Sequence, residues 1–334
     1  MRKSVILFSQ SPLDISYVLY LYEKYKYKYN IKIFVVSVYN NYKFLSSLNL
    51  EVQELKFIPF ISIKNPFKAF VYSFKLKFVY YKYFQKEVNS KVYFFSDNSD
   101  YITSFFINKL SKKNKILFVD IFNIYGEKIS NIKLYLIKLI AKILFGVDIE
   151  FFKIVNKISY KYKFNKFNKI KINLDKSKLN HYLYNIKCEN NSKKNILFIE
   201  SKIPDGIFRN YDKDLINCMN KIIKEYNIYI KPHPRLGYSK IIDNYNVKII
   251  DNYIPAEFID IKSFDMIFGI ISSSISTIEH KNKISLINFF SFIDEKQKLF
   301  YKDYLIKKQI SEINFIEKYD FEKIIEKDRK DNEN

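Results

Sequence analysis

Short runs of apolar residues alternate with longer amphipathic segments along most of this 334-residue chain. The runs are rich in isoleucine, valine, phenylalanine and tyrosine, which favour strands, and the segments between them have the length of helices. Strands that alternate with helices predict parallel sheets connected by right-handed crossovers. The strands predicted from this pattern cover residues 4–9, 31–38, 52–58, 91–96, 115–122, 195–201, 226–232, 247–251, 265–272 and 284–290.

The strand pattern starts afresh in the second half of the chain, after a segment of different composition. Residues 153–178 hold nine lysines and a single acidic residue, with no clean period. We interpret 151–194 as a boundary region made of a basic helix and a polar linker. The sequence therefore predicts an α/β protein of two Rossmann-like domains, 1–170 and 195–334, with the linker at 171–194. Two such domains place their parallel sheets across a ligand cleft, at the carboxyl ends of the strands.

The formal net charge of +22 comes almost entirely from lysine, because the chain has only four arginines. Lysine, asparagine, isoleucine, tyrosine and phenylalanine are all abundant, which is typical of an AT-rich genome and is one explanation of the charge. The other explanation is attraction to a polyanion, such as an anionic membrane surface, a glycan or nucleic acid. Arginine is the residue that reads base edges through paired hydrogen bonds, so its scarcity argues against a nucleic-acid partner.

Cysteine usage and the lack of long apolar runs predict a cytoplasmic protein. Cys188 and Cys218 are isolated and follow no metal-ligand or disulfide spacing. The apolar stretch near the N-terminus is too short for a signal peptide, and no apolar run is long enough to span a bilayer. The apolar segment 132–147 carries three lysines, which fits either a buried helix with lysines at its rim or a helix on a membrane surface. With the lysines of 153–178, it predicts peripheral attachment to the inner face of the cytoplasmic membrane.

Histidine, arginine, proline and glycine, all scarce in this chain, gather in the stretch IYIKPHPRLG, at the end of a predicted strand. Pro232 and Pro234 fix their own φ and keep the residues before them extended, so His233 is held rigidly just beyond the strand. Lys231 and Arg235 flank this histidine with positive charge. A histidine in such a place can donate to a phosphate or protonate a leaving group. An isolated His-Pro pair also fits a structural turn with an exposed histidine.

Two further segments of the second half carry polar groups that suit a nucleotide. Ser272, Ser273 and Ser274 follow an apolar strand and begin a helix-like segment, where hydroxyls and free N–H groups together make an anion site. Glu257 comes two residues after Pro255, and its carboxylate can bind a pair of ribose hydroxyls. Taken singly, these residues also fit an ordinary helix cap and a solvated carboxylate.

Together these segments resemble the bacterial sialyltransferases of glycosyltransferase family 52 and the related capsule polysialyltransferases. The resemblance rests on a strand followed by Lys-x-His-Pro, then Pro-x-Glu, then a serine run. It implies a fold of the GT-B type and CMP-sialic acid as the donor. Lys231 and Glu257 match positions that hold the cytidine and ribose, and His233 matches a histidine that contacts the CMP phosphate and is the proposed general acid. The three serines cover the motif that binds the same phosphate.

The first half of the chain adds two points of resemblance. Ser11 lies in a Ser-Pro-Leu loop similar to the family's first-strand loop, which lines the sugar side of the cleft. Asp120 matches the second acid of an acidic motif that supplies the general base, although Val119 and Ile121 replace the first acid and the glycine of that motif. Asp205, which precedes a glycine after the first strand of the second half, is the other candidate for the base.

The resemblance implies an inverting transferase that moves sialic acid or a related nonulosonate from a CMP-activated donor to a glycan or glycolipid, such as lipooligosaccharide or capsule. The N-terminal domain would take the acceptor and the C-terminal domain the nucleotide sugar. No metal or other cofactor is expected, because the transfer that the resemblance implies needs none and the sequence has no histidine cluster with ligand spacing. Other cytidine-nucleotide transferases stay open, either a Kdo transferase or a wall-polymer glycerophosphotransferase, as does an inactive relative that binds glycans or polyanions.

Overall fold

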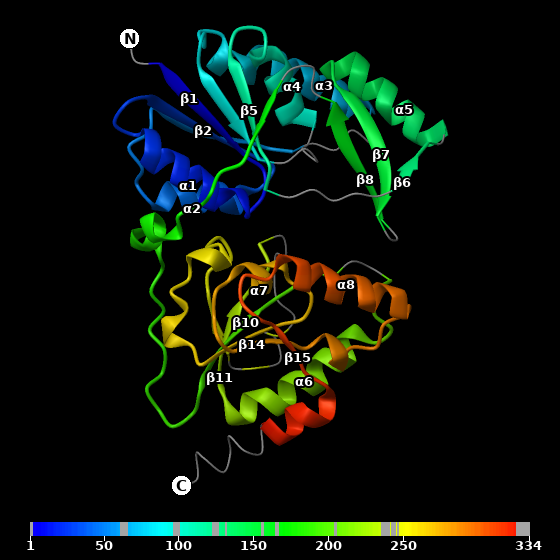
Figure 1. The fold of residues 1–334 in the computed structure, drawn as a ribbon. Helices are drawn as coiled ribbons and strands as arrows, with labels where there is room; N and C mark the ends of the chain where they lie inside the picture. The colour runs from blue at the N-terminus through cyan, green and yellow to red at the C-terminus, as the bar shows by residue number, and fades with distance from the viewer. Residues whose placement is uncertain are drawn as a thin grey trace. The chain divides into compact units, whose positions relative to one another are not determined.

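The computed structural model describes residues 3–60, 66–95, 101–121, 127–130, 132–154, 157–163, 167–203, 206–234, 241, 245 and 247–324 (Figure 1). The chain divides into two compact units, Met1–His181 and Tyr182–Asn334. Each unit is built around one parallel sheet of six strands. The predicted α/β class with two Rossmann-like halves is therefore confirmed.

The sheet of the first unit has the strand order β3-β2-β1-β4-β5-β9, and its neighbouring strands pair in parallel. Its strands are β1 (Ser4–Ser9), β2 (Asn30–Val36), β3 (Glu54–Ile58), β4 (Lys91–Phe94), β5 (Lys115–Val119) and β9 (Asn168–Ile170). All but β9 coincide with predicted strands. The pattern missed β9 because this strand has three residues, of which only one is apolar.

Helices pack on the first sheet and extend beyond it. They are α1 (Asp14–Tyr25), α2 (Tyr39–Ser47), α3 (Pro66–Lys75) with its continuations η1 (Leu76–Tyr80) and η2 (Tyr81–Phe84), α4 (Tyr101–Leu110), and α5 (Ile132–Ile140) with its continuation η3 (Ala141–Phe145). The predicted helix at 132–147 is confirmed as α5 and η3. Gly146 ends it with a φ of 65°, a left-handed conformation that glycine adopts without strain.

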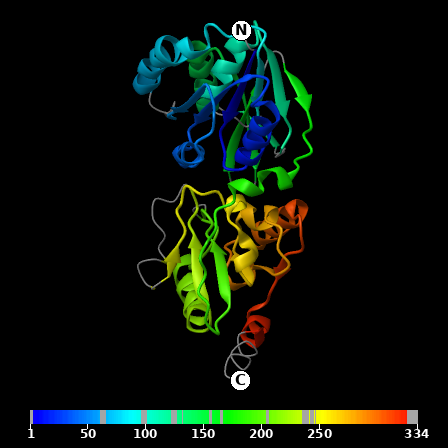
Figure 2. The same cartoon turned by 90° about the vertical axis from the view of Figure 1, so that its left-hand side faces the viewer.

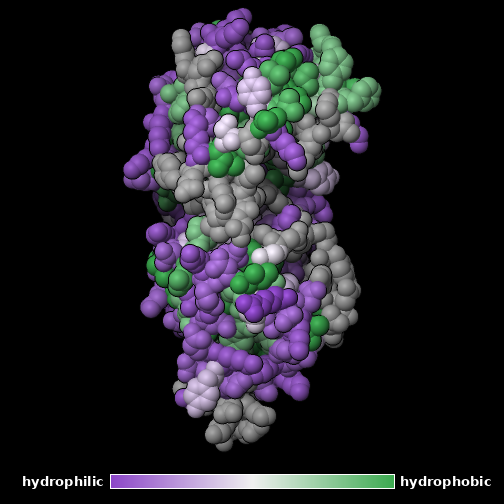
Figure 3. All heavy atoms as spheres, turned by 90° about the vertical axis from the view of Figure 1, so that its right-hand side faces the viewer, coloured by the Kyte–Doolittle hydropathy of each residue, from purple (hydrophilic) through white to green (hydrophobic). Residues whose placement is uncertain are grey.

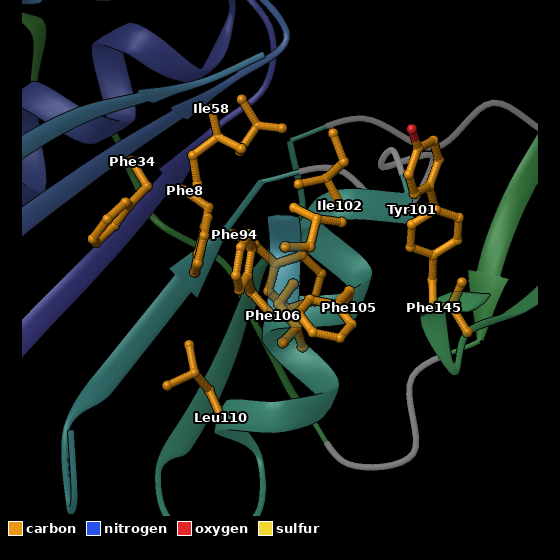
Figure 4. Close-up of a cluster of buried hydrophobic side chains, with 14 of the residues drawn as sticks. Phe8, Phe34, Ile58, Phe94, Tyr101, Ile102, Phe105, Phe106, Leu110 and Phe145 are labelled. Atoms are coloured by element: carbon orange, nitrogen blue, oxygen red, sulfur yellow. The ribbon is translucent and has the colours of Figure 1, made fainter. Parts of the chain in front are cut away.

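Aromatic side chains fill the core between the first sheet and α4. Phe8, Phe34 and Phe94 come from β1, β2 and β4 and belong to one buried cluster with Phe106 of α4 (Figure 4). The ring centroids of Phe8 and Phe34 lie 5.7 Å apart, and those of Phe8 and Phe106 lie 6.1 Å apart. Rings at these separations gain energy beyond the burial of their area, so this cluster holds the strands of the first sheet in register.

A three-stranded antiparallel sheet occupies part of the segment for which a basic helix was predicted. Its strands are β6 (Glu127–Ile129), β7 (Asp148–Ile154) and β8 (Lys157–Lys163), and β7 and β8 form a hairpin. The helix prediction was wrong. In KISYKYK, at 157–163, apolar residues alternate with lysine and serine, which is the period of a strand and not of a helix.

The sheet of the second unit has the order β12-β11-β10-β13-β14-β15, again with parallel neighbours. Its strands are β10 (Asn195–Ile199), β11 (Asn227–Lys231), β12 (Lys248–Ile249), β13 (Met266–Gly269), β14 (Lys283–Ser285) and β15 (Asn314–Phe315). All but the two-residue β15 coincide with predicted strands. The two sheets have equivalent strand orders, and in each the chain first builds outward on one side and then on the other, which defines a doubly wound sheet.

Helices lie on both faces of each sheet (Figure 2). Those of the second unit are α6 (Tyr211–Glu225), α7 (Ser273–Thr277) and α8 (Glu295–Lys308), with the 3₁₀ turns η5 (Ala256–Phe258), η6 (Ile261–Ser263) and η7 (Ile287–Phe289). In α6 the buried residues Leu215, Cys218, Met219 and Ile222 recur at helical spacing, so one stripe of the helix packs on the sheet. None of the described helices is both long and apolar enough to cross a membrane.

Between β9 and β10 the chain forms the turn η4 (Lys176–Tyr182) and then an extended stretch. Within the second unit, Tyr184 pairs with the residues around Ile259, because its N–H donates to the carbonyl of Phe258 at 2.7 Å and its carbonyl accepts from the N–H of Asp260 at 2.9 Å. The stretch after η4 is therefore anchored to the loop that follows η5.

Candidate functional site

The carboxyl ends of β10, β11 and β13 meet at one edge of the second sheet, where its strand order reverses. β10 lies between the other two strands, with β12 beyond β11 and β14 beyond β13. In doubly wound sheets ligands bind at such a switch point. Glu200 and Ser201 follow β10, Pro232 and His233 follow β11, and Ser272 comes shortly after β13. This edge, which we call the switch edge, gathers most of the residues selected from the sequence of the second half.

Close backbone contacts fix the geometry of the switch edge. Ser201 Oγ accepts a hydrogen bond from the N–H of Ile271 at 3.2 Å, which joins the ends of β10 and β13. A Cβ on Gly269 would lie 3.4 Å from the carbonyl oxygen of Ile199 and 3.4 Å from Ile275 Cδ1. These distances are those of ordinary van der Waals contact, so α7 packs directly against the ends of the strands and its serines lie near the edge.

Lys231 ends β11 and is buried, with 3% of its surface exposed. Its Nζ donates to the carbonyl oxygen of Pro232 at 2.6 Å and to that of Asn252 at 3.3 Å. Burial lowers the pKa of this amine to about 8, against the attraction of the Glu257 carboxylate and two further acids. The lysine therefore connects the Lys-Pro-His-Pro bend to the loop before Glu257, and it is mostly protonated at pH 7.

His233 follows β11 directly and is half-buried. Pro232 before it is buried, and Pro234 after it restricts its backbone to an extended form. His233 thus lies beyond the end of a strand, as predicted. The predicted partner Arg235 lies outside the described residues, as does the alternative base Asp205.

Glu257 and the serine run approach each other through α7. The hydroxyl of Thr277 in α7 donates to Glu257 Oε1 at 2.9 Å, and η5 packs against this helix. Ser272 is buried and precedes α7, whereas Ser273 and Ser274 are half-buried in its first turn. The structure therefore brings a carboxylate and four hydroxyl-bearing residues, Thr277 and the three serines, together at the switch edge.

Two residues of α8 join this group, and the sequence pattern did not point to them. The side chain of Ser273 hydrogen-bonds to Tyr304, and Lys308 Nζ donates to the Tyr304 hydroxyl at 3.1 Å. Burial lowers the pKa of the Lys308 amine to about 7 and raises that of the Tyr304 phenol. The spacing of Tyr304 and Lys308 puts them on one face of a helix. Only the tertiary packing of α8 against α7 shows that they reach Ser273.

In the first unit the loop after β1 is organised by Asp14, a buried carboxyl that the sequence analysis did not select. Asp14 Oδ2 accepts from the N–H of Gln10 at 2.6 Å and of Ser11 at 2.9 Å, and Oδ1 accepts from Ser11 Oγ at 2.9 Å. Burial raises the pKa of this carboxyl from 3.8 to about 6, although these hydrogen bonds oppose the rise. Ser11 is therefore held in place by Asp14. A serine three residues before an aspartate is a known helix-start pattern that could have identified it.

We expect Asp14→Asn to remove a pH dependence of stability. The rise in pKa means that the folded state keeps the proton after the unfolded state has lost it, so this stabilisation is complete below pH 3.8 and is lost as pH rises through about 6. It amounts to roughly 3 kcal/mol. An asparagine oxygen can accept from both N–H groups while its amide donates to Ser11, without any buried charge.

Urea unfolding at pH 4 and pH 7.5 checks this expectation. The free energy of unfolding of Asp14→Asn, measured relative to that of the unsubstituted chain, should be higher at pH 7.5 than at pH 4, by up to about 3 kcal/mol. Asp14→Ala is the matched control, because it leaves two N–H groups unpaired and should lower stability at both pH values. An equal difference between the unsubstituted chain and Asp14→Asn at the two pH values would contradict the assigned pKa.

Asp120, the first-choice base, follows β5 in the first unit. Its N–H donates to the carbonyl of Ile170 in β9 at 3.1 Å, and its Oδ2 lies 2.7 Å from Lys169 Nζ. The carboxylate is therefore part of an ion pair with a lysine that is half exposed. Like Ser11, it lies at the carboxyl edge of the first sheet and not in the group at the switch edge. Among the residues that the structure describes, no cluster of three His, Cys, Asp or Glu side chains could hold a metal ion.

No protein-family model and no curated protein sequence matches the chain. Solved structures with a similar course of the chain include the Escherichia coli heptosyltransferase WaaC with ADP, at a TM-score of 0.44, 10% identity and coverage of 97% of this chain and 99% of the other. A family 9 glycosyl transferase from Veillonella parvula has a TM-score of 0.42, 10% identity and coverage of 98% and 91%. A protein described as a UDP-N-acetylglucosamine 2-epimerase from Listeria monocytogenes has a TM-score of 0.40, 7% identity and coverage of 83% and 76%. Likeness at this level identifies no family for the chain.

Proposed function

We propose that this chain is an inverting glycosyltransferase that moves sialic acid, or a related nonulosonate, from a CMP-activated donor to a cell-surface glycan or glycolipid. The observation that carries the proposal is the gathering of Lys231, His233, Glu257 and the serines 272–274 at the switch edge. These are the residues through which the sequence resembles the family 52 sialyltransferases. Parallel strands spaced about 4.8 Å apart put the ends of β11 and β13 roughly 10 Å from each other, a span suited to a nucleotide.

Each group has a chemical role in this proposal. The Glu257 carboxylate accepts hydrogen bonds from ribose hydroxyls, and the serine hydroxyls and backbone N–H groups donate to the phosphate. Lys231 binds the carbonyl oxygen next to His233, so its positive charge lies beside the phosphate site. Lys308, joined to Ser273 through Tyr304, adds a second amine near the serines.

Transfer from a CMP donor builds positive charge at the anomeric carbon and negative charge on the departing phosphate. Donors already aimed at this phosphate stabilise the charge as it develops. His233 protonates or hydrogen-bonds the leaving phosphate, and a carboxylate removes the proton of the acceptor hydroxyl. Asp120 is proposed for that base, with Asp205 as the alternative, and Ser11 for the sugar side of the site. No metal or other cofactor takes part in these steps.

The proposed acceptor predicts the location of the chain in the cell. A lipid-linked acceptor lies at a membrane, and the net charge of +22 favours an anionic membrane surface, so we propose a cytoplasmic chain held at the inner face of the membrane. Release of CMP from CMP-sialic acid, measured with and without a glycan acceptor, tests the function. A Kdo transferase or a wall-polymer glycerophosphotransferase would use the same cytidine site with another donor.

One observation favours a second candidate function. The ion pair between Asp120 and Lys169 engages the carboxylate proposed as the base. A chain that has lost this base, and keeps only the nucleotide and glycan sites, would bind CMP sugars or anionic glycans without transferring them. The transfer assay distinguishes the two functions, because binding alone releases no CMP.

A further inference from the structure

Helix α3 and its continuation η1 expose a stripe of large apolar side chains. The stripe consists of Phe67, Phe70, Phe74 and Phe78, which recur at helical spacing, and the exposed fractions of Phe67 and Phe78 are 77% and 72%. Phe70 packs on Phe74 with ring centroids 4.9 Å apart, and Phe74 stacks on Phe78 at 6.0 Å. The opposite face of the helix is the one that enters the core, through Ala69, Tyr72 and Leu76. The helix is therefore apolar on the core side and on the side that faces water.

Helix α5 and its continuation η3 repeat this arrangement. The core takes Leu134, Ala141 and Phe145. The exposed stripe consists of Ile132, Tyr135, Leu136, Leu139 and Ile143, and the exposed fractions of Ile132 and Ile143 are 82% and 68%. The alternative of a buried helix with lysines at its rim is therefore wrong for 132–145, since half of its large apolar side chains are exposed and only Leu134 and Phe145 among them are buried.

The two stripes belong to neighbouring elements. α3 packs against η3, the continuation of α5. In the space-filling view, hydrophobic side chains gather over the part of the first unit that contains these helices (Figure 3). Monomeric soluble proteins seldom expose large contiguous apolar patches unless a partner or a membrane covers them. We call the two stripes together the α3/α5 surface.

The charges within the two helical segments are of one sign. Residues 66–84 include four lysines and residues 132–145 include three, and neither segment contains an acidic residue. Asp148, just beyond the second segment, lies 3.8 Å from Lys138. The hairpin β7–β8, whose β7 packs against α5, adds further lysines in its sequence. Long lysine side chains can lie along apolar surface and keep their amines in water.

We propose that the α3/α5 surface docks on an anionic lipid bilayer, with the apolar stripes entering the boundary between headgroups and acyl chains. A helix with an apolar face and a lysine-rich rim binds membranes in this way, and phenylalanine and tyrosine suit that boundary. The lysines complement phosphate headgroups. A second copy of the chain is the wrong occupant, because it would bring together two surfaces whose helical segments each hold seven lysines and no acidic residue.

This proposal rests on the proposed function, because a membrane-borne acceptor is the reason for the chain to bind a membrane. It assigns the membrane attachment of the chain to a defined surface. The sequence-based reason for membrane binding was the lysines of 153–178 together with those of the apolar segment 132–147. The α3/α5 surface adds an apolar contribution that does not depend on charge. Vesicle binding requires no donor and no transfer. A chain that binds vesicles and transfers no sugar would therefore contradict the proposed function and leave the surface intact.

The test is flotation of the full chain with vesicles of phosphatidylcholine alone and of phosphatidylcholine mixed with phosphatidylglycerol. We expect recovery with the anionic vesicles, and less recovery as salt rises, since headgroup attraction is screened over about 8 Å at physiological salt. The double variant Phe74→Glu with Leu136→Glu, one change in each stripe, should lower the recovery roughly tenfold or more, because it puts carboxylates where acyl chains would lie.

The matched control is Leu299→Glu with Ile306→Glu on α8, where both side chains are also exposed. This pair changes the net charge by the same amount and should leave vesicle recovery unchanged. Equal thermal unfolding of both double variants shows that the fold is intact. Equal recovery with the two vesicle types, equal loss in the two double variants, or a dimer of the unsubstituted chain that the stripe variant abolishes would each overturn the proposal.

Discussion

His233→Ala should lower the rate of sugar transfer from a CMP donor by roughly 10²–10³-fold while leaving the fold intact, which is the effect of removing one preorganised donor from a developing negative charge. The side chain is half-buried at the end of β11, so little packing is lost. The backbone of the bend is held independently, by Pro232, Pro234 and the amine of Lys231. Initial rates of CMP release with acceptor present measure the effect.

His181→Ala is the matched control for this experiment. His181 lies in η4 of the first unit, where its Nε2 is 3.4 Å from Glu23 Oε1. Its removal costs one surface contact and should leave transfer unchanged. Near-normal turnover of His233→Ala would remove His233 from the catalytic group.

Asp120→Asn should lower transfer by about 10²–10⁴-fold, the usual contribution of a general base. Asparagine keeps the size of the side chain and loses the ability to take a proton. Because Asp120 is paired with Lys169, the change also breaks an ion pair, so Lys169→Met is needed beside it. The Lys169 variant loses the ion pair and keeps the carboxylate, and it should retain transfer.

Asp205→Asn completes the comparison. If Asp205→Asn is inactive and Asp120→Asn is fully active, the base belongs to the second half of the chain. The match of Asp120 to the acidic motif would then be wrong. If the single variant Lys169→Met also loses transfer, the ion pair itself is required. The loss of transfer in Asp120→Asn would then not be due to the loss of a proton acceptor.

The strands were predictable because their apolar runs are dense and end in polar residues. The run VILFS of β1 and the run NILFI of β10 each predict a buried strand, because they are short and contain β-branched and aromatic residues. β9 and β15 are too short to give a periodic pattern, and pairing with a neighbouring strand is what makes them strands. The hairpin β7–β8 lies in a lysine-rich segment for which a helix was predicted, whereas the alternation within KISYKYK is that of a strand.

The exposure of α3 and α5 could not be predicted for a different reason. In both helices apolar residues occur all round the axis, which usually indicates burial. The rest of the chain decides whether the second apolar stripe of such a helix is buried or exposed. The spacing of apolar residues within the helix does not contain this information. The structure shows that one stripe packs in the core and that the other, including Phe78 and Ile132, faces water.

The parts of the site that depend on neighbouring residues in the sequence were predictable. The parts that depend on contacts between distant segments were not. Two prolines around His233 predict its position beyond β11 from three adjacent residues. The carbonyl partners of Lys231, the hydrogen bond of Thr277 to Glu257, and the approach of Tyr304 to Ser273 join segments that are far apart in the sequence. Asp14 shows a mixed case, because its spacing from Ser11 is local but its burial is not.

The most direct test of the proposed transferase is CMP release from CMP-sialic acid by the unsubstituted chain, with and without a glycan acceptor and with His233→Ala beside it. We expect the release of CMP by the unsubstituted chain to rise when the acceptor is added, and we expect His233→Ala to release CMP much more slowly. CMP-Kdo in place of CMP-sialic acid distinguishes the two donors at the same cytidine site. Release no faster than that of His233→Ala with either CMP sugar, or equal turnover of UDP- or ADP-activated sugars, would contradict the proposed function.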